Sequence, residues 1–330
     1  MLYRKLVGLA LVACVSCASA QTFSFGLWGD MPYAKAGDDA KLPAVLKSIN
    51  SADIAFSIYD GDIKDGSSKC TDNVYTDALA MFNSMKKPVV YLPGDNEWTD
   101  CHRLNNGGYD GLERLAHVRK VMFPAATSLG QRTLPLTRQG ALGQAFVENI
   151  RFHHKAIEFV GLNIPGSNNN LILGDKDCSD KSARTPEQCA ASNKEYAERN
   201  AANIVWLQTS FESAKANKAR GLVLVFQGDP GFDLPETQEL DESMAPAVSG
   251  YRDFIKAVIA ETEKFSGQVL LVHGDTHFFK VDKPLYSPTK LLPNLTRLQT
   301  FGSPSLHWVR VTVDTKSQHV FNIQPVIVKH

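Results

Sequence analysis

The sequence predicts an α/β protein whose strands form a mixed sheet or two stacked sheets. From residue 23 onward, apolar runs typical of strands alternate with stretches of helical periodicity. Five of the apolar runs end in Gly-Asp, and the first two spacings are 32 residues from Asp30 to Asp62 and 33 from Asp62 to Asp95. This spacing matches a β-α-β unit, whose crossover helix makes the two strands parallel.

The first half of the chain reads as three such units. We expect strands at about 23–28, 53–59 and 88–92, each an apolar, β-rich run. Helical periodicity fills the intervals near 39–50 and 73–85, and a further helix is expected at 109–123.

The second half begins with two β-type runs, near 144–151 and 155–163, which resemble an antiparallel pair. A long helix at about 190–217 leads into a strand ending at Gln227, and residues 234–247 are polar and irregular. A helix near 249–264 then precedes a strand ending at His273. The runs at 296–301, 306–313 and 319–328 predict an all-β closing sheet.

The first 20 residues resemble a secretory signal peptide. Arg4 and Lys5 precede the short apolar run LVGLALVACV, and Ala18-Ser19-Ala20 supplies the small residues of a cleavage site. A lipoprotein signal cut before Cys14 is the minor alternative. No later segment is long and apolar enough to span a membrane, so we expect a secreted or periplasmic protein with one domain over residues 21–330.

Four cysteines remain after the leader: Cys70, Cys101, Cys178 and Cys189. An even number in an exported chain favours disulfides, with three possible pairings. We favour Cys70–Cys101, which would brace the segments after Asp62 and Asp95, and Cys178–Cys189, which would close a polar excursion. Free thiols and zinc ligation are the alternatives, although no short Cys-x-x-Cys spacing supports zinc.

Charge and motifs exclude several classes of function. Without Arg4 and Lys5, 33 basic residues face 35 acidic ones, so neither a nucleic-acid footprint nor a polybasic membrane patch is present. The chain also lacks G-x-S-x-G, G-x-x-x-x-G-K-[ST] and G-x-G-x-x-G. Nothing in the sequence indicates an oligomeric state.

The five strand-end aspartates are the candidate functional residues: Asp30, Asp62, Asp95, Asp229 and Asp275. Ligands of open α/β sheets bind beyond the carboxyl ends of the strands, and carboxylates supply hard oxygen for divalent metals. A single Gly-Asp is ordinary turn chemistry, and Asp30, Asp95 or Asp229 alone would be read as a turn residue. Asp62, crowded by two further carboxylates, and the His273-Gly-Asp-Thr-His277 run are the stronger signals.

In their order, these motifs resemble the calcineurin-like metallophosphoesterases. That family carries D-x-H, GD-x-x-D, GNH-[DE], a histidine near a later strand end, and GH-x-H. This chain has Asp30-Met-Pro32, Gly61-Asp62-Ile-Lys-Asp65, Gly94-Asp95-Asn96-Glu97, Gln227-Gly-Asp229 and Gly274-Asp275-Thr-His277, across roughly residues 23–280. The resemblance implies a four-layer αββα sandwich of two mixed sheets flanked by helices.

The resemblance also implies a site of one or two divalent cations. Asp30, Asp62 and His277 match ligand positions directly, Asp95 stands where the family has asparagine, and Asp275 stands where it has histidine. Gln227 or Asp229 takes the place of the remaining histidine. Because oxygen replaces imidazole at several positions, magnesium, manganese or calcium is favoured over zinc or iron.

Two departures concern catalysis. Pro32 replaces a ligand histidine, and Asn96 replaces the histidine that in the family protonates or stabilises the leaving group. His102 and His273 are candidates for the displaced proton donor, with Asp62 as the central catalytic ligand. The expected function is an exported metal-dependent hydrolase of a phosphate mono- or diester. The alternative is a catalytically degenerate envelope protein that binds a metal or a phosphorylated ligand.

Overall fold

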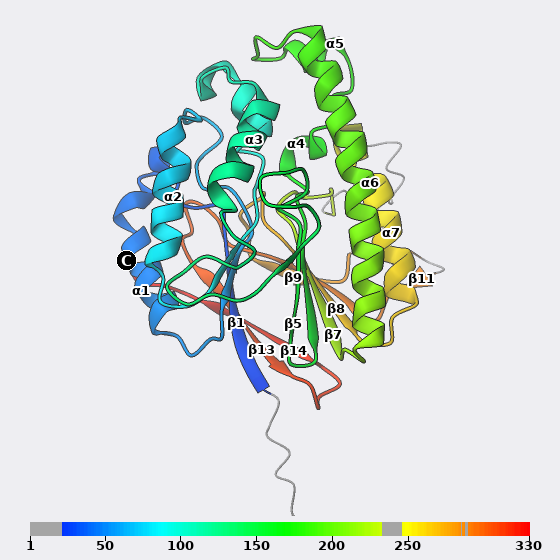
Figure 1. Cartoon of the computed structure of the whole chain (residues 1–330). Helices are drawn as coiled ribbons and strands as arrows, with labels where there is room; N and C mark the ends of the chain where they lie inside the picture. The colour runs from blue at the N-terminus through cyan, green and yellow to red at the C-terminus, as the bar shows by residue number, and fades with distance from the viewer. Residues whose placement is uncertain (1–21, 233–245, 285, 288–289) are drawn as a thin grey trace, which may run out of the picture.

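Two β-sheets stack face to face, and helices cover the outer side of each, as the computed structural model shows (Figure 1). The structure describes residues 22–232, 246–284, 286–287 and 290–330. The predicted leader and most of the polar stretch predicted at 234–247 lie outside these residues.

The first sheet has the order β14-β13-β1-β2-β3 within the described chain. Strand β1 (Thr22–Trp28) pairs in parallel with β2 (Ser57–Tyr59), and β2 with β3 (Val89–Tyr91). On the other side, β1 pairs antiparallel with β13 (Trp308–Asp314), which pairs with β14 (Phe321–Val326). The β-α-β repeats of the sequence therefore place the ends of β1, β2 and β3 at one edge.

The second sheet has the described order β4-β5-β6-β7-β8-β12-β9. Strands β6 to β8 and β12 are parallel neighbours, while β4, β5 and β9 add antiparallel strands at the two sides. The bounds are β4 (Thr137–Arg138), β5 (Ile150–His154), β6 (Ile157–Gly161), β7 (Gly221–Val225), β8 (Gln268–His273), β9 (Lys280–Asp282) and β12 (Leu295–Gln299). A separate ribbon pairs β10 (Tyr286–Ser287) with β11 (Lys290–Leu291).

Alternation along the strands divides the apolar residues into three layers of core. Phe25 and Leu27 of β1 face the second sheet, where they join Phe159 and Val223, whereas Trp28 packs outward. Leu222 and Leu224 of β7 pack on the opposite, helical side. Since side chains alternate between the faces of a strand, each sheet supplies one face to the central core and one to its helices.

The helices are distributed between the two outer faces. Helices α1 (Leu42–Ser51), α2 (Asp72–Ser84) and α3 (Gly111–Met122) cover the first sheet, and α6 (Pro186–Ala216) and α7 (Arg252–Glu263) cover the second. Short elements line the strand-end loops: η1 (Ala34–Ala36), η2 (Asp38–Ala40), η3 (Thr99–His102), η4 (Leu104–Asn106), α4 (Gly166–Asn169), α5 (Asp175–Ser179) and η7 (Pro246–Tyr251).

The predicted four-layer αββα arrangement is confirmed, but two local predictions are wrong. The three closing runs are strands, yet they do not form one sheet, because β12 joins the second sheet beside β8 while β13 and β14 extend the first. The strand predicted from residue 144 begins only at Ile150, since residues 142–148 form turns. Alternation defines a strand but does not identify its partner.

Both favoured disulfides are present, Cys70–Cys101 and Cys178–Cys189. The second closes the polar excursion, which carries the short helix α5 and then enters α6 through a capping box at Thr185. Within the described ranges, no helix combines the length and apolar character needed to cross a membrane.

Candidate active site at the strand ends

Four of the strand-end residues have a left-handed backbone, which turns the chain sharply beyond the strand. The φ angles are 49° at Asp30, 64° at Asp62, 73° at Asp275 and 68° at His277. Non-glycine residues seldom adopt this region, and they persist there when the surrounding structure holds them. The geometry aims all four side chains at the same edge of the stacked sheets.

Glycine is required at two of these ends because a carboxylate lies against the backbone. A Cβ atom added to Gly94 would lie 2.1 Å from Oδ1 of Asp62, and one added to Gly274 would lie 2.1 Å from Oδ2 of Asp30. Any larger residue would displace the carboxylate. In both cases the glycine of one Gly-Asp pair leaves space for the aspartate side chain of another pair on a different loop.

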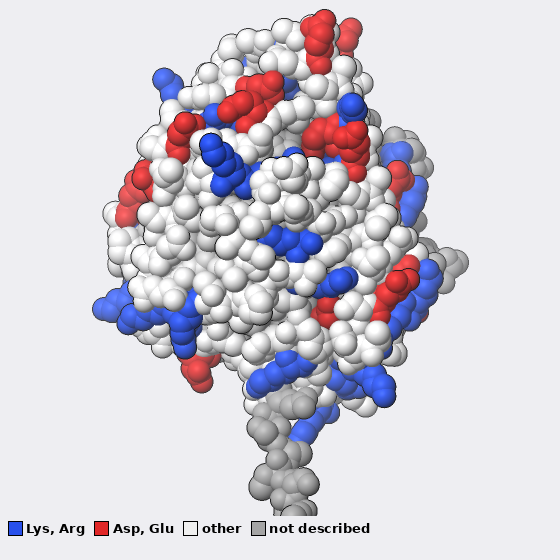
Figure 2. All heavy atoms as spheres, in the orientation of Figure 1, with Lys and Arg blue, Asp and Glu red and all other residues white. Residues whose placement is uncertain are grey.

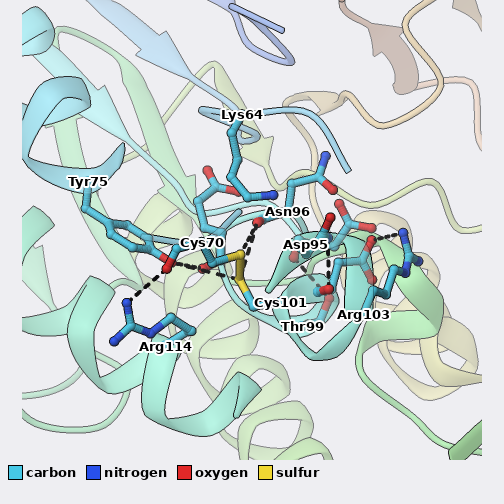
Figure 3. The surroundings of a disulfide bond; sticks show 12 residues. Lys64, Cys70, Tyr75, Asp95, Asn96, Thr99, Cys101, Arg103 and Arg114 are labelled. Carbon is cyan, nitrogen blue, oxygen red and sulfur yellow. Dashed lines mark hydrogen bonds and ion pairs between the residues drawn. A yellow bond between two sulfur atoms is a disulfide. The ribbon is translucent and has the colours of Figure 1, made fainter. Parts of the chain in front are cut away.

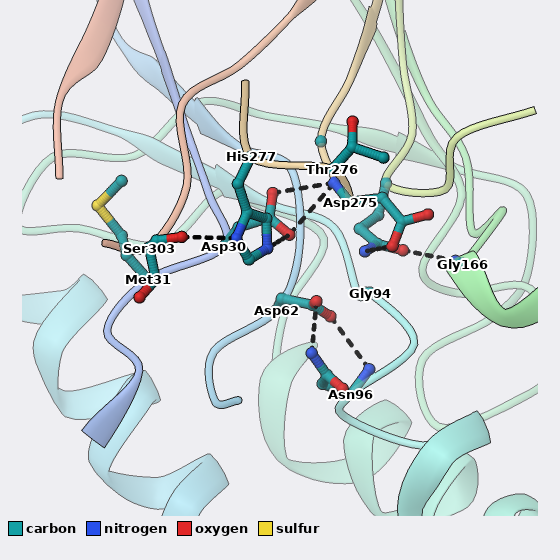
Figure 4. Close-up of polar contacts among 12 residues, drawn as sticks. Asp30, Met31, Asp62, Gly94, Asn96, Gly166, Asp275, Thr276, His277 and Ser303 are labelled. Carbon is teal, nitrogen blue, oxygen red and sulfur yellow. Dashed lines mark hydrogen bonds and ion pairs between the residues drawn. The ribbon is translucent and has the colours of Figure 1, made fainter. Parts of the chain in front are cut away.

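Asp62 is surrounded by hydrogen-bond donors (Figure 4). Its Oδ1 accepts from the backbone N–H of Asn96 at 3.0 Å, and its Oδ2 accepts from Nδ2 of Asn96 at 2.6 Å. The hydroxyl of Tyr33 donates to the same Oδ2 at 2.9 Å. Asp62 and Asn96, both predicted from the sequence as catalytic residues, are therefore direct neighbours.

Asp30 lies between His277 and the backbone of Asp275 (Figure 4). Both oxygens of Asp30 lie 3.2 Å from the N–H of Asp275, and Oδ1 lies 3.5 Å from Nε2 of His277. The Nδ1 of His277 is 2.7 Å from the carbonyl of Ser303, so Nδ1 carries the donated hydrogen and Nε2 faces the carboxylates and Tyr33.

The buried amide of Gln227 joins two further aspartates. Its Nε2 lies 3.4 Å from Oδ1 of Asp95 and 3.3 Å from Oδ1 of Asp275, while its Oε1 accepts from the N–H of Gly166 at 2.6 Å. A Cβ atom on Gly166 would lie 2.6 Å from Asp95 and 2.7 Å from Asp275. Asp95, Gln227 and Asp275 therefore form one contact group.

Glu97 fixes the loops that carry this group. Its carboxylate is fully buried and accepts from the backbone N–H groups of Ile63 at 3.0 Å and Gly94 at 3.1 Å. Nearby, the Cys70–Cys101 disulfide joins the segment after Asp62 to the segment after Asp95, as predicted (Figure 3). These cross-links brace the two loops.

Like charges are concentrated in the site. The pKa of Asp62 is raised well above its usual value by burial and then by the charges of Asp95, Glu97 and Asp30. The pKa of Asp275 is raised as well, by removal of the carboxylate from water and then by Asp95. Carboxylates that hold each other's pKa high attract a positive charge to their midst.

His277 contributes one positive charge to the cluster. Burial opposes protonation of its ring, but the hydrogen bond to Asp30 and the charge of Asp30 outweigh that effect and raise the pKa of His277 to about 9. A single imidazolium offsets only part of the carboxylate charge.

Three sequence-predicted site residues lie outside these contacts. Asp229 turns its carboxylate to the N–H groups of Gly231 and Phe232, at 2.9 and 3.3 Å, and contributes only its own N–H to Asp275. His273 is fully buried, with its ring stacked on Phe226 and Nδ1 3.1 Å from the carbonyl of Gly274.

His102, at the end of η3, lines an adjacent cavity. Burial, reinforced by the charges of Arg184 and Arg103, lowers the pKa of His102 to about 3. The imidazole is therefore neutral near pH 7 and does not supply an imidazolium proton there.

The side chains do not form a finished metal shell as they stand. Within the described part of the chain, no three His, Cys, Asp or Glu side chains are arranged to hold an ion. The chemistry of the donor set nevertheless fits a hard divalent cation: Asp30, Asp62, Asp95 and Asp275 are carboxylates at one strand-end edge, and burial among like charges raises the pKa of Asp62 and of Asp275.

Sequence reasoning did not identify two residues that contact the cluster, Tyr33 and Ser167. The Ser167 hydroxyl lies 2.9 Å from Oδ2 of Asp95. A signal for Ser167 exists, because it follows an apolar strand and stands in Gly-Ser-Asn-Asn-Asn, a run that suits the left-handed backbone observed at residues 167–170. Tyr33 has no such local signal.

Comparison with known proteins places the fold. No family model matches the sequence, and no curated protein does. Among solved structures, PhoD superimposes over 89% of this chain with a TM-score of 0.55 and 13% sequence identity. The match spans 64% of the PhoD chain, less than two thirds of its length.

Two other structures are similar at lower scores. GAP50, the anchor in the inner membrane complex of Plasmodium, matches 94% of this chain and 90% of its own, with a TM-score of 0.43 and 11% identity. The 5'-nucleotidase from Candida albicans matches 92% of this chain and 50% of its own, with a TM-score of 0.39 and 10% identity. Neither score supports an inference. The likeness to PhoD concerns the fold alone, which in this chain is an α/β fold of two mixed sheets flanked by helices.

Proposed function

We propose that this chain is an exported, metal-dependent phosphoesterase, formed by one domain over residues 21–330, that hydrolyses a phosphate mono- or diester. One observation carries the proposal: four aspartates at one strand-end edge, Asp30, Asp62, Asp95 and Asp275, on a metallophosphoesterase-type fold. The raised pKa values at Asp62 and Asp275 support a site that attracts cations.

Asp30, Asp62 and His277 would hold one side of the metal site, and Asp95, Gln227 and Asp275 the other. When bound, a divalent cation supplies Lewis acidity that polarises a phosphoryl oxygen and acidifies water. The oxygen-rich donor set favours magnesium, manganese or calcium over zinc or iron.

The chain's own residues orient the ester. The Asn96 amide and the Tyr33 hydroxyl are 3.2 Å apart and present hydrogen-bond donors beside Asp62, where they would hold a phosphoryl oxygen. Lys64, which stands two residues after Asp62, donates from Nζ to the carbonyl of Asp65 at 2.8 Å. Neither His102 nor His273 reaches this point in the described structure, and the leaving-group oxygen would meet Asn96 and Tyr33.

The test is hydrolysis of p-nitrophenyl phosphate and bis(p-nitrophenyl) phosphate by chelator-treated protein reloaded with Mn²⁺, Mg²⁺ or Ca²⁺. Asp62→Asn should reduce kcat by roughly 100-fold or more, the scale of removing one group that stabilises transition-state charge. Asp77→Asn, the same change on the exposed face of α2, is the matched control and should keep its rate. Turnover that is unaffected by chelation, or by Asp62→Asn, would contradict the proposal.

The second candidate is a non-catalytic, ligand-binding member of this fold, and a specific observation favours it. The carboxylates that would bind metal already accept hydrogen bonds from Asn96, Tyr33, Gln227 or backbone N–H groups. In the same experiment, this candidate predicts metal binding with no turnover of either ester, and Asp62→Asn then alters metal content alone.

A further inference from the structure

A polar cavity of about 490 Å³ adjoins the carboxylate cluster and is not used by the function proposed above. Its walls come from η3 and η4, from the turn at residues 167–173, and from residues 177–184, which run from α5 toward α6 in the segment that the Cys178–Cys189 disulfide closes. This volume lies within the range of small-molecule sites, and it exceeds what one phosphate group requires.

One hydroxyl links the cavity to the proposed catalytic site. Ser167 lines the cavity, and its Oγ lies 2.9 Å from Oδ2 of Asp95 and 2.7 Å from Oδ1 of Asp100. Nη2 of Arg103 donates to the same Oγ at 3.3 Å, while Nη1 pairs with Asp100 at 2.6 Å (Figure 3). A ligand in the cavity would therefore lie one side chain away from Asp95.

The wall that carries Ser167 is held in an unusual conformation. Residues 167–170 all have positive φ, between 50° and 66°, although isolated left-handed residues are the norm. Arg199 secures this turn from beneath: it is fully buried, and it donates to Oδ1 of Asn169 at 2.6 Å and to the Asn169 carbonyl at 2.8 Å. Backbone strain that the surroundings hold in place is typical of binding sites.

The inner wall is positively charged. Arg184 is half-buried and is fixed by the carbonyls of Cys178, at 3.0 Å, and Asp177, at 2.8 Å; no carboxylate of the described residues forms a salt bridge with it. Beside it lies His102, whose Nδ1 is buried without a hydrogen-bond partner among the described residues. Burial, and then the positive charges of Arg184 and Arg103, lower the pKa of this imidazole.

Three acidic side chains also line the cavity: Asp100, Asp177 and Asp180. Asp177 and Asp180 are exposed, as is Lys181, whereas Arg103, Arg184 and His102 are half-buried. Asp100, the buried carboxylate, is already paired with Arg103. Figure 2 shows acidic and basic side chains both present around the upper part of the molecule, so overall surface charge does not select the ligand. The ligand is selected by the half-buried guanidinium groups of Arg103 and Arg184 inside the cavity.

We propose that this cavity is an anion-binding subsite, which selects phosphate esters whose alcohol portion carries a second phosphate or carboxylate group. The role of this subsite in substrate selection rests on the proposed phosphoesterase activity. The binding of an anion to the subsite does not depend on that activity. Arg184 and Arg103 bind the second anionic group, and His102 lines the wall beside them. The segment that the Cys178–Cys189 disulfide closes thereby determines which phosphate esters are preferred as substrates.

Adenosine 5'-monophosphate and adenosine 3',5'-bisphosphate provide matched probes that differ by one phosphate. In the metal-loaded protein, kcat/KM should be roughly tenfold or more higher for the bisphosphate, the scale of one charge-assisted hydrogen bond. Arg184→Gln should abolish this preference through KM while the monophosphate constants stay within about twofold, as expected for loss of binding shared by ground and transition states. Arg184→Lys should restore part of the preference.

Lys176→Gln is the matched control, since Lys176 lies on α5, two residues before Cys178, and does not line the cavity. Lys181→Gln tests a second cavity residue, whose side chain forms no hydrogen bond or ion pair with the described residues. This variant therefore remains informative if Arg184→Gln fails to fold. We expect a smaller loss of preference with Lys181→Gln. Equal loss with Lys176→Gln, or no loss with either cavity variant, would overturn the subsite.

Titration calorimetry of chelator-treated protein with the bisphosphate separates the two proposals. Binding of one bisphosphate, weakened by Arg184→Gln, supports the subsite even in a protein that hydrolyses nothing. Hydrolysis of both nucleotides at equal kcat/KM, with no calorimetric binding, rejects the subsite and leaves the phosphoesterase proposal intact. Inorganic phosphate is the third probe: binding as tight as that of the bisphosphate would identify a site for free phosphate and reject substrate selection.

Discussion

The hydroxyl of Tyr33 donates a 2.9 Å hydrogen bond to Oδ2 of Asp62, and it also lies 3.3 Å from Nε2 of His277. Two side chains proposed as metal ligands thus share one phenol as a neighbour. When no cation is bound, the Tyr33 phenol is a polar neighbour that contacts both Asp62 and His277.

Tyr33→Phe should therefore strengthen cation binding. The phenol's hydrogen bond contributes about 0.5–1.5 kcal/mol, so its removal should tighten Mn²⁺ binding roughly 2- to 12-fold. Calorimetry of chelator-treated protein measures the change, with Tyr109→Phe as a control because Tyr109 contacts Arg114 through its ring. Equal or weaker Mn²⁺ affinity in the Tyr33 variant would show that the phenol does not compete with the cation.

Much of this site was predictable from the sequence, because the order of the β-α-β repeats along the chain determines where the aspartates lie. Each β-α-β repeat returns the chain to the same edge, so Asp30, Asp62 and Asp95 meet wherever the parallel pairing holds. Gln227 and Asp229 could not be separated in this way. They lie two residues apart in one turn, and only the fold decides which side chain enters the site and which caps its own loop.

The partners of the aspartates were not predictable for a different reason. Tyr33 and Ser167 reach the site from loops that the tertiary structure brings together, 29 and 72 residues away in sequence from the carboxylates they contact. The same limit applies to β12, whose composition predicts a strand but not its parallel neighbour β8. Long-range packing selects these contacts.

Asp275→Asn should stabilise the metal-free protein while weakening its response to metal. Removal of the carboxylate from water and the charge of Asp95 raise the pKa of Asp275, so its ionised form is unfavourable in the fold. The neutral amide should raise the free energy of unfolding by about 1 kcal/mol, measured by urea titration at pH 8 with chelator. Added Mn²⁺ should then stabilise the natural protein more than the variant. A fall in stability on substitution would indicate that the hydrogen bond from Asp229 outweighs the repulsion.

His102 should make the fold sensitive to mild acid. Its pKa is about 3 in the folded protein, mainly because of burial, and about 6.5 when unfolded. Between these values the unfolded chain binds a proton that the folded chain does not, so this contribution to stability is full above pH 6.5 and falls as pH drops. From pH 7 to pH 5, the natural protein should lose about 1 kcal/mol more than His102→Gln, after allowance for the partial exposure of the ring. Parallel urea titrations at the two pH values measure this difference, and equal losses would contradict the assigned environment.

Arg199 should be among the side chains on which stability depends most. It is fully buried, pairs with Glu195 at 2.6 Å, and donates to the carbonyl of Asn163 at 3.1 Å in addition to its bonds with Asn169. Arg199→Met would remove the guanidinium from Asn169 and leave the carboxylate of Glu195 without its cation, at a cost of about 3–5 kcal/mol in the free energy of unfolding. Lys194→Met, on the same helix, removes only the exposed 3.9 Å pair with Glu198 and should cost less than about 0.5 kcal/mol. Urea titration with tryptophan fluorescence suits the measurement, because the guanidinium lies 5.2 Å from the ring centre of the buried Trp98.

The left-handed turn at residues 167–170 depends on the same guanidinium. Bisphosphate binding should therefore decline in Arg199→Met even at temperatures where the variant is folded. A variant that is destabilised yet binds the bisphosphate normally would show that the subsite does not depend on this turn.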